Sequence, residues 1–387
     1  MTLRPGIALG CLALLSLGGC GIFGGDDEPI EPPAELVEFE ATLEVREAWE
    51  FRAGSGAERL GLALRPAVEG GRVYVAGRDG RVHALDLESG DRLWTTETDV
   101  ALAAGPAAGF GLVAVGGSDG MVIALDAGDG SVRWQAQLSG EVLASPAVTA
   151  QAVVVRSVDG YLRALAPDTG EEIWAAEQRP PRLTLRGTGA PATGGGLVVS
   201  GFDNGRVAAY DLRDGEQRWE QTIAIGRGRT EIERLADVDA TPQIVPPDVF
   251  AVGYQGRVVS LSLETGQLLW ANEMSSHKGL GVDWTSLYVT TDESEVVGMS
   301  RASGGELWRQ DALRLRRLTA PTPHGQSVVV GDFEGWLHWL DPISGRLQAR
   351  HRAGDASFIT APVSGGELLI AQDEEDRVYA LRTEPRG

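Results

Sequence analysis

The stretch PAVEGGRVYVAGRDGRVHALDLESGDRLW, residues 66–94, recurs along the chain and decides its fold. Close copies are PAAGFGLVAVGGSDGMVIALDAGDGSVRW at residues 106–134 and PAVTAQAVVVRSVDGYLRALAPDTGEEIW at residues 146–174. Two further copies end at Trp219 and Trp270, with the same spacing from an opening proline. Such regularity indicates a repeat architecture rather than a single irregular domain.

Each copy predicts four short strands. After a brief first strand, Val73-Tyr74-Val75 is a β-branched and aromatic run typical of a second strand. Asp79-Gly80 then supplies a two-residue turn, because glycine tolerates positive φ and aspartate readily visits it. Val82 to Leu85 predicts the third strand, Ser89-Gly90 the next turn and Leu93-Trp94 the fourth strand. Four strands at a period of about 40 residues are the signature of a β-propeller blade.

The blades can be counted by the tryptophan that closes each copy. The last copy begins at Pro362 and ends after its third strand, whereas Val45 to Trp49 is a fourth strand without a blade. We therefore expect an all-β, eight-bladed propeller of four-stranded antiparallel blades, closed by an N-terminal strand that completes the last blade. We expect the slot tryptophans to pack blade against blade. Seven slots hold Trp49, Trp94, Trp134, Trp174, Trp219, Trp270 and Trp308, and the eighth holds Ala349.

Composition fits one large domain that does not bind polyanions. The chain has 387 residues, 43% of them hydrophobic, which is enough for a sizeable core. Its formal net charge is −21, from 34 basic and 55 acidic residues. The average field of such a chain repels phosphate backbones and anionic membrane surfaces, so nucleic acid is excluded as a partner.

The N-terminus predicts a secreted and lipid-anchored protein. Arg4 is a short positive region and Ile7 to Leu17 an apolar stretch too short to span a bilayer, so residues 1–19 are expected to be a signal peptide. Leu17-Gly18-Gly19-Cys20 resembles the lipobox of bacterial lipoproteins, in which the cysteine is lipidated. The alternative is a plain secretory signal with a bystander cysteine. In lipoproteins a residue other than Asp after the cysteine implies delivery to the outer membrane, and here it is Gly21.

Residues 20–39 follow as the lipidated Cys20 and a flexible tether, because they are rich in Gly, Pro and acid. The propeller is expected over residues 40–387. If the lipobox is used, this domain faces the periplasm from the outer membrane.

Two connections between blades are enlarged, and both are expected on the face that carries the Asp-Gly turns. The first, AAEQRPPRLTLRGTGA at residues 175–190, places Leu183, Leu185 and Arg186 where they could anchor a protein partner. Alternatively, these leucines pack under their own loop as a satellite core. Insertions on one face of a repeat protein often mark its binding face.

The second enlarged connection is EQTIAIGRGRTEIERLADVDA at residues 220–240. Thr230 and Glu233 have the spacing of a capping box for a short helical turn. Asp237 and Asp239 flank a single residue, as metal ligands or arginine acceptors do, although turn capping explains them equally well. One blade departs from the pattern, because Asp292-Glu293-Ser294 replaces its Asp-Gly turn.

Catalytic motifs are missing from the sequence. The five histidines form no HExxH motif and no close pair, and neither a P-loop nor a calcium loop occurs. We therefore expect no enzymatic activity, no metal and no cofactor.

With the repeats, the tryptophans and the lipobox in place, the chain resembles the BamB family of propeller lipoproteins. The runs RLTLRG at residues 182–187 and TEIERLADVDATP at residues 230–242 look like that family's own loops. The resemblance implies a non-catalytic scaffold of the outer-membrane β-barrel assembly (Bam) complex, which binds the periplasmic POTRA region of BamA and aids insertion of outer-membrane proteins. It leaves open whether the scaffold also contacts unfolded outer-membrane proteins. By matching position it implies a partner-contact region made of Leu183, Leu185, Arg186, Asp237 and Asp239.

Two other classes share this architecture. Quinoprotein dehydrogenases resemble the repeat but use an adjacent cysteine pair and a calcium site, whereas this chain has no cysteine after Cys20. A periplasmic propeller that binds sugar or peptide is the other alternative. It would be favoured if convergent polar groups lined the central channel.

Overall fold

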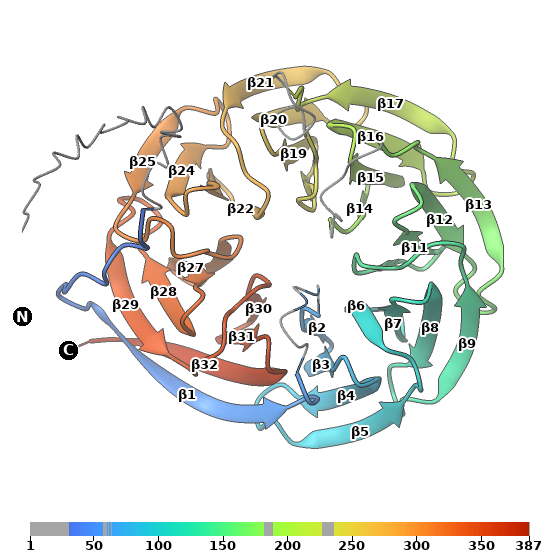
Figure 1. The fold of residues 1–387 in the computed structure, drawn as a ribbon, viewed down its shortest axis with the longest axis horizontal. Coiled ribbons are helices and arrows are strands. Elements are labelled where there is room, and N and C mark those ends of the chain that lie inside the picture. Colours follow the sequence, from blue (N-terminus) through green and yellow to red (C-terminus); the bar gives the residue numbers. More distant parts are fainter. Residues whose placement is uncertain are drawn as a thin grey trace, which may run out of the picture. The chain divides into compact units, whose positions relative to one another are not determined.

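Short antiparallel strands form all the regular secondary structure that is described. The structure is a computed structural model, which describes residues 31–56, 60, 62, 64–181, 189–226 and 236–386. In this part of the chain the strands form eight four-stranded sheets, arranged as blades around a central channel (Figure 1). The fold is an eight-bladed β-propeller, as the repeats predict.

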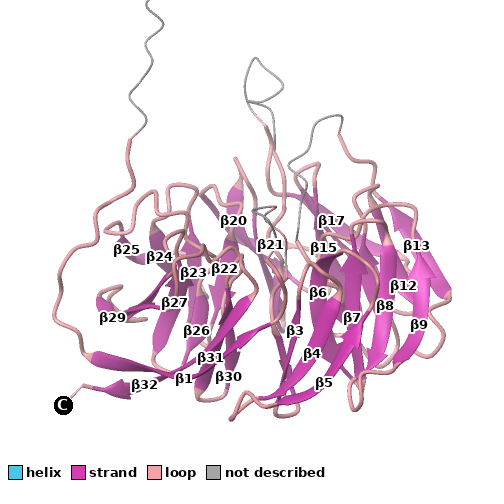
Figure 2. Ribbon diagram, turned by 60° about the horizontal axis from the view of Figure 1, so that its bottom comes forward, coloured by secondary structure: helices cyan, strands magenta, loops and turns pink. Residues whose placement is uncertain are grey.

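The blades follow one another in chain order, each running from an inner first strand to an outer fourth strand (Figures 1 and 2). The first four blades consist of β2 Ala67–Glu69, β3 Arg72–Ala76, β4 Arg81–Asp86 and β5 Arg92–Glu97; β6 Leu102–Gly109, β7 Leu112–Gly117, β8 Met121–Asp126 and β9 Val132–Gln137; β10 Ala147–Val148, β11 Val153–Arg156, β12 Tyr161–Leu165 and β13 Glu172–Glu177; and β14 Ala192–Gly194, β15 Leu197–Phe202, β16 Arg206–Asp211 and β17 Gln217–Thr222. The second four consist of β18 Gln243–Val245, β19 Asp248–Val252, β20 Arg257–Ser262 and β21 Leu268–Glu273; β22 Gly279–Val282, β23 Ser286–Thr290, β24 Val296–Ser300 and β25 Glu306–Gln310; β26 Thr322–His324, β27 Ser327–Gly331, β28 Trp336–Leu340 and β29 Leu347–Arg352; and β30 Val363–Gly365, β31 Leu368–Gln372 and β32 Arg377–Pro385 with β1 Leu43–Arg52.

The last blade is built from both ends of the chain. Its strand order is β1-β32-β31-β30, so the N-terminal strand β1 takes the outer position. β1 pairs with β32 from Leu43 opposite Pro385 to Arg52 opposite Arg377. A strand from the start of the chain thus covers the edge that β32 would otherwise expose.

Each tryptophan slot joins two blades in the same way. The indole Nε1 donates a hydrogen bond to a backbone carbonyl in the turn between the third and fourth strands of the next blade. The seven bonds measure 2.7–3.2 Å and join Trp49 to Leu87, Trp94 to Ala127, Trp134 to Pro167, Trp174 to Leu212, Trp219 to Leu263, Trp270 to Arg301 and Trp308 to Pro342. The buried ring and its satisfied N–H are what an interior tryptophan requires.

A glycine in that same turn makes room for the indole. At Gly90 the φ angle is +72° and an added Cβ would lie 2.6 Å from the Trp49 ring. At Gly345 the corresponding distance to Trp308 is 2.4 Å. The glycine turn between the third and fourth strands therefore reverses the chain and also receives the neighbouring tryptophan.

At the eighth slot, Ala349, the large and the small residue of the facing strand pair have changed places. In the other blades a small residue on the third strand faces the tryptophan, as Ala84 faces Trp94 and Gly298 faces Trp308. In the seventh blade Trp339 on β28 faces Ala349 on β29. Trp339 is fully buried and fills the core shared by the seventh and eighth blades, although its indole nitrogen has no hydrogen-bond partner there.

The sixth blade keeps the turn geometry without glycine. Ser294 has φ of +63° and its amide donates to the Thr291 carbonyl at 2.9 Å, as Gly80 donates to Gly77 in the first blade. The buried Ser294 hydroxyl also accepts a hydrogen bond from the Leu318 amide at 3.2 Å. This second bond is one that glycine could not provide.

Residues 34–39, expected to belong to the flexible tether, instead contact the sixth and seventh blades. The Ala34 amide donates to the Arg314 carbonyl at 2.9 Å, and the Arg316 guanidinium donates to the Ala34 carbonyl at 3.0 Å. Arg350 donates to the Val37 carbonyl at 3.2 Å, and its guanidinium stacks over the Phe39 ring, 5.2 Å from the ring centroid. The predicted boundary at residue 40 therefore falls several residues too late.

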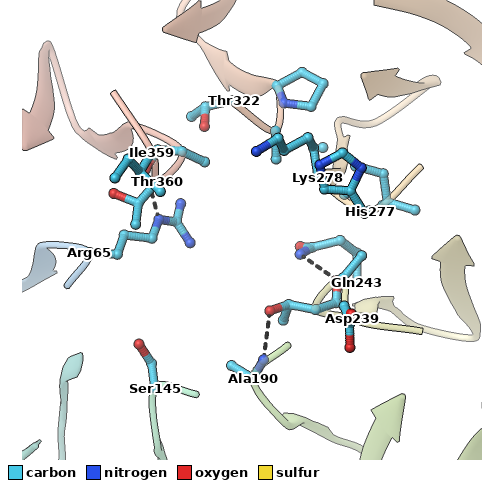
Figure 3. A pocket seen from close by; sticks show the side chains of 18 of the residues that line it. Arg65, Ser145, Ala190, Asp239, Gln243, His277, Lys278, Thr322, Ile359 and Thr360 are labelled. Carbon is cyan, nitrogen blue, oxygen red and sulfur yellow. Dashed lines mark hydrogen bonds between the residues drawn. The ribbon is translucent and has the colours of Figure 1, made fainter. Parts of the chain in front are cut away.

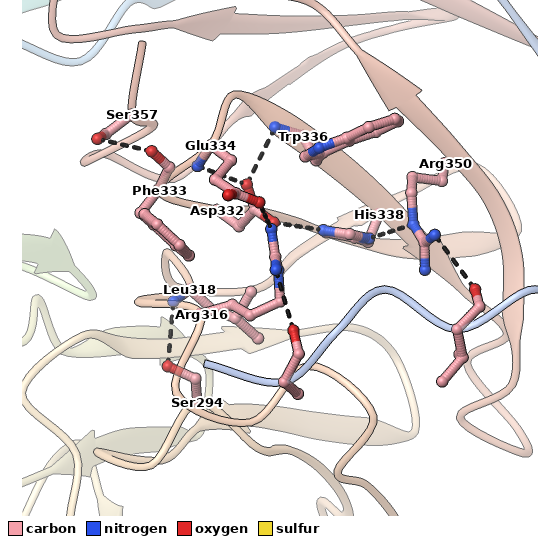
Figure 4. Close-up of polar contacts among 12 residues, drawn as sticks. Ser294, Arg316, Leu318, Asp332, Phe333, Glu334, Trp336, His338, Arg350 and Ser357 are labelled. Atoms are coloured by element: carbon pink, nitrogen blue, oxygen red, sulfur yellow. Dashed lines mark hydrogen bonds and ion pairs between the residues drawn. The ribbon is translucent and has the colours of Figure 1, made fainter. Parts of the chain in front are cut away.

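A buried polar chain holds these two arginines in place (Figure 4). Asp332 is fully buried and accepts from Arg316 Nε at 2.8 Å and from His338 Nε2 at 3.0 Å. Arg350 Nε lies 3.3 Å from the other histidine nitrogen, Nδ1. Burial lowers the pKa of His338, which keeps the imidazole neutral and able to accept that bond. We call residues 34–39 and this arginine chain the N-terminal strap.

Candidate partner-binding face and central channel

Both enlarged connections start and end on one face of the ring. The backbone amide of Gln178, after β13, donates to the Gly160 carbonyl at 2.8 Å. The backbone amide of Ile223, after β17, likewise donates to the Gly205 carbonyl at 2.9 Å. Gly160 and Gly205 lie in the turns between second and third strands, so the chain leaves each blade beside these turns. We call this side the connection face. The connections follow the third and fourth blades, which are neighbours in the ring (Figure 1).

The structure describes only some of the predicted contact residues. Leu183, Leu185 and Arg186, together with the predicted capping box of Thr230 and Glu233, lie outside the described residues. Asp237 and Asp239 are described, and neither is the freely exposed carboxylate that contact with a partner would favour.

Asp237 is fully buried where the chain returns from the second enlarged connection. Its carbonyl accepts from the Tyr254 amide at 2.8 Å, and the next amide, Val238, donates to Phe202 at 3.2 Å. These bonds attach the segment to both the fourth and the fifth blade. The position of Asp237 therefore suits a residue that holds the loop rather than one that touches a partner.

Asp239 lies at the wall of the central channel. Burial raises its pKa to about 7, and the negative charges of Asp237 and Asp203 add to this effect, whereas Arg156 opposes it. Its buried Oδ1 has no hydrogen-bond partner. A carboxylate in this state is poised to accept a proton or a hydrogen-bond donor near neutral pH.

An arginine that sequence reasoning missed joins the end of the first connection to the fourth blade. Arg156, at the end of β11, is buried and ion-paired with Asp203 of the fourth blade. Its Nη1 also reaches the carbonyl of Gly189, where the chain returns from the first connection. The corresponding end of the second strand is Ala76 in the first blade and Gly331 in the seventh. A lone arginine at a position that is Ala or Gly in four other blades was the signal that could have found it.

The central channel holds a cavity of about 310 Å³ at its connection-face end. Its lining includes residues immediately before the inner strands of several blades, among them Ser145, Ala190, Ala240 and Ala320. Polar side chains converge there as well (Figure 3). Those that line the cavity are Arg65, Ser145, Asp239, Thr241, Gln243, His277, Lys278, Thr322 and Thr360.

The described residues offer no cluster of three or more His, Cys, Asp or Glu side chains that could bind a metal. Nor does this part of the chain contain a helix of the length and apolarity that crossing a membrane would require. Asp237 and Asp239 are thus not metal ligands in any cluster seen among these residues.

Sequence comparison identifies the family. A family model described as Outer membrane protein assembly factor BamB matches residues 35–101, 78–310 and 292–385. The chain belongs to the BamB family. A BamB from Alkalilimnicola ehrlichii is 48% identical over 370 residues, covering 96% of this chain and 95% of the relative. The Escherichia coli K12 BamB is 35% identical over 392 residues, covering 98% of this chain and 100% of the relative.

Solved structures agree with the BamB assignment. The crystal structure of BamB from Moraxella catarrhalis has a TM-score of 0.80 at 25% identity, covering 88% of this chain and all of that one. A europium-containing methanol dehydrogenase has a TM-score of 0.68 at 14% identity, covering 87% and 93%. At that identity the second likeness concerns the propeller fold alone.

Proposed function

We propose that this protein is a non-catalytic scaffold of the outer-membrane β-barrel assembly machinery. Its connection face binds the periplasmic POTRA region of a BamA-type subunit and thereby aids insertion of outer-membrane proteins. Cys20 carries the lipid anchor, and the propeller faces the periplasm from the outer membrane. Membership of the BamB family supports this role for the chain as a whole.

One structural observation carries the choice of face. Two enlarged connections leave neighbouring blades on the same side, and their returning ends meet, because the Ala190 amide donates to Thr241 Oγ1 at 3.0 Å. The Arg156–Asp203 ion pair lies beside Gly189 at the end of the first connection. A buried pair of this kind fixes the geometry of the groups around it. The two connections therefore act as one surface rather than as two independent loops.

The predicted contact residues divide into two roles. We propose that Leu183, Leu185 and Arg186 touch the partner directly, because apolar groups beside arginine favour interface cores. Asp237 instead holds the second connection between the fourth and fifth blades, since its carboxylate is buried. Asp239 faces the channel and contributes to the floor of this surface.

The test is binding of purified variants to the isolated POTRA region of the partner. We expect Leu185→Asp and Arg186→Glu each to weaken binding by at least about 2 kcal/mol, because each places a mismatched charge in a desolvated contact. Circular dichroism should show both variants folded.

The matched control is Arg81→Glu, a charge reversal in the first blade, across the ring from the two connections. Arg81 is exposed and pairs only with exposed or half-buried acids, so its reversal should leave affinity nearly unchanged. Wild-type affinity in both loop variants would refute the connection face as the docking site.

A further inference from the structure

The channel cavity contains an unusual lysine. Lys278 is the only lysine among 387 residues, in a chain whose other basic side chains are nearly all arginine. It lies just before β22, and its side chain extends toward the cavity (Figure 3). No described residue accepts a hydrogen bond from its ammonium group. A half-buried cation without an acceptor is unfavourable unless something else supplies one.

The surroundings of Lys278 explain why the protein itself does not supply that acceptor. Burial lowers the pKa of Lys278, and the nearby charge of Arg317 lowers it further. Asp292 is the acid that opposes this effect, but its oxygens accept from His277 and Ser275. The ammonium therefore retains free donors on the cavity side.

Arg65 presents a second cation from another wall of the cavity (Figure 3). Its Nε donates to the Ala361 carbonyl and its Nη2 to the Pro362 carbonyl, both at 3.0 Å. These two bonds fix the guanidinium plane, while Nη1 has no acceptor among the described residues. A guanidinium held in this way is preorganised to bind an oxyanion.

The other polar groups of the wall limit the negative charge of the ligand and favour a ligand that donates a hydrogen bond. Asp239 is the carboxylate that lines the cavity, and its buried Oδ1 lacks a hydrogen bond. The buried hydroxyl of Thr360 also lacks a hydrogen-bond partner among the described residues. A multiply charged anion would be repelled by Asp239, whereas a ligand with one carboxylate and one N–H or O–H group would satisfy both kinds of site.

We propose that the channel cavity is a binding site for a small monocarboxylate that carries a hydroxyl or amino group. The carboxylate lies between Lys278 and Arg65, and the donor group faces Asp239. The volume of about 310 Å³ lies at the small end of the range for ligand pockets, which suits a molecule of a few heavy atoms. The site shares Asp239 with the floor of the proposed docking surface, but ligand binding can be measured without a protein partner.

Calorimetry on the full mature chain in detergent micelles tests the proposal, with three probes. Sodium L-lactate should bind saturably, and its uncharged analogue lactamide should not. Inorganic phosphate should bind more weakly than lactate, because its second charge faces Asp239. Absence of lactate binding at millimolar concentrations, or equal binding of lactamide, would overturn the proposal, and tighter binding of phosphate would overturn the carboxylate assignment.

Substitutions then locate the site. Lys278→Met and Arg65→Gln should each weaken lactate binding by about tenfold or more, as expected for loss of a hydrogen bond to a charged group. Lys278→Arg should retain most of the affinity, and Arg81→Gln, outside the channel, should retain all of it. If lactate binds Lys278→Met and Arg65→Gln as tightly as wild type, it binds elsewhere and the proposal fails.

A measurement on the wild-type protein avoids any dependence on the folding of variants. Reductive methylation with ¹³C-formaldehyde labels Lys278 as the one lysine, and its dimethylammonium signal can be followed by NMR. That signal should shift with lactate and saturate at the concentration found by calorimetry. A signal that stays constant while lactate binds would place the ligand away from Lys278.

Discussion

Trp339 and Ala349 show how the packing of one residue depends on the blade next to it. The other slot tryptophans bind a carbonyl and a glycine in the turn between the third and fourth strands of the next blade. The eighth blade has no such turn, because its outer strand β1 comes from the start of the chain. An indole at residue 349 would lack both the carbonyl and the glycine, so the large side chain, Trp339, lies on the third strand instead.

This explanation predicts energetic coupling between the two positions. Trp339→Ala should cost about 3–5 kcal/mol by leaving a cavity, and Ala349→Trp about 1–3 kcal/mol by overpacking. The double variant should be less unstable than the sum of the two, because the new indole occupies part of the vacated space. Urea unfolding of the four proteins measures the coupling. Strict additivity would show that the two sites do not share a space.

Asp239 gives a residue-level prediction about pH. Its folded pKa of about 7 exceeds the ordinary unfolded value near 4, so the folded state binds the proton more tightly. The stability from this group is fully present below about pH 4 and is lost as the pH rises through 7. Asp239→Asn should remove this loss. The free energy of unfolding of the variant, relative to that of wild type, should therefore rise by about 2 kcal/mol between pH 5 and pH 8.

The check is chemical denaturation of both proteins at several pH values. A constant difference between wild type and Asp239→Asn would show that Asp239 ionises as freely as an exposed carboxylate. Asp203→Asn is a useful comparison, because it removes one of the neighbouring charges that raise the pKa of Asp239.

At the scale of the strand, β1 links the stability of the ring to the chain's N-terminal segment. Deleting residues 40–50 would remove most of β1 together with Trp49, whose indole donates to Leu87 in the first blade. The edge of β32 would be exposed and one junction between blades lost. We expect a markedly lower Tm and a tendency to aggregate. An unchanged Tm in thermal unfolding would mean that β1 adds little to the ring.

Features that repeat along the chain could be predicted from the sequence, whereas features that occur only once could not. The strands, the Asp-Gly turns and the tryptophan slots recur with a fixed period, so the blade architecture followed from the sequence. The burial of Asp237 did not, because it depends on which two blades the returning chain passes between. Arg156 acts through partners in the next blade, Asp203 and Gly189, which no local pattern connects to it.

The strap at residues 34–39 was missed for a related reason. Its Gly-, Pro- and acid-rich surroundings are typical of a linker. Its attachment rests on Arg316 and Arg350, some 280 or more positions later in the chain. Composition describes a segment by itself, whereas these contacts belong to the folded ring.

At the scale of the whole molecule, the predicted lipid anchor should determine where the protein is found but not whether it folds. Cys20→Ser should leave a folded propeller but release it into the soluble periplasmic fraction, because the acyl chains hold the protein at the membrane. Fractionation at high salt, followed by detection of the protein, measures the change. A variant that still sediments with membranes would show that Cys20 is not the anchor, or that a protein partner alone retains the chain.

If Cys20 carries the predicted lipid anchor, the attachment of residues 34–39 limits the length of chain that can separate the propeller from the membrane. If all of residues 21–39 were free, the domain could reach roughly 65 Å from the lipidated cysteine, whereas with residues 34–39 attached the reach is roughly 45 Å. The volume searched scales with the cube of this length, so attachment reduces it to about a third. A partner in the same membrane would then meet the propeller at a correspondingly higher effective concentration.

The place where the N-terminal segment leaves the ring matters as well. Arg316 lies in the connection between the sixth and seventh blades, and its carbonyl accepts from the Phe333 amide beside a turn of the connection face. If Cys20 is anchored as proposed, a pull along the N-terminal segment would act on the connection face, which carries the two enlarged connections. Under the proposed anchoring, the attachment of residues 34–39 would limit both the reach of the propeller and the face that it presents to its partner.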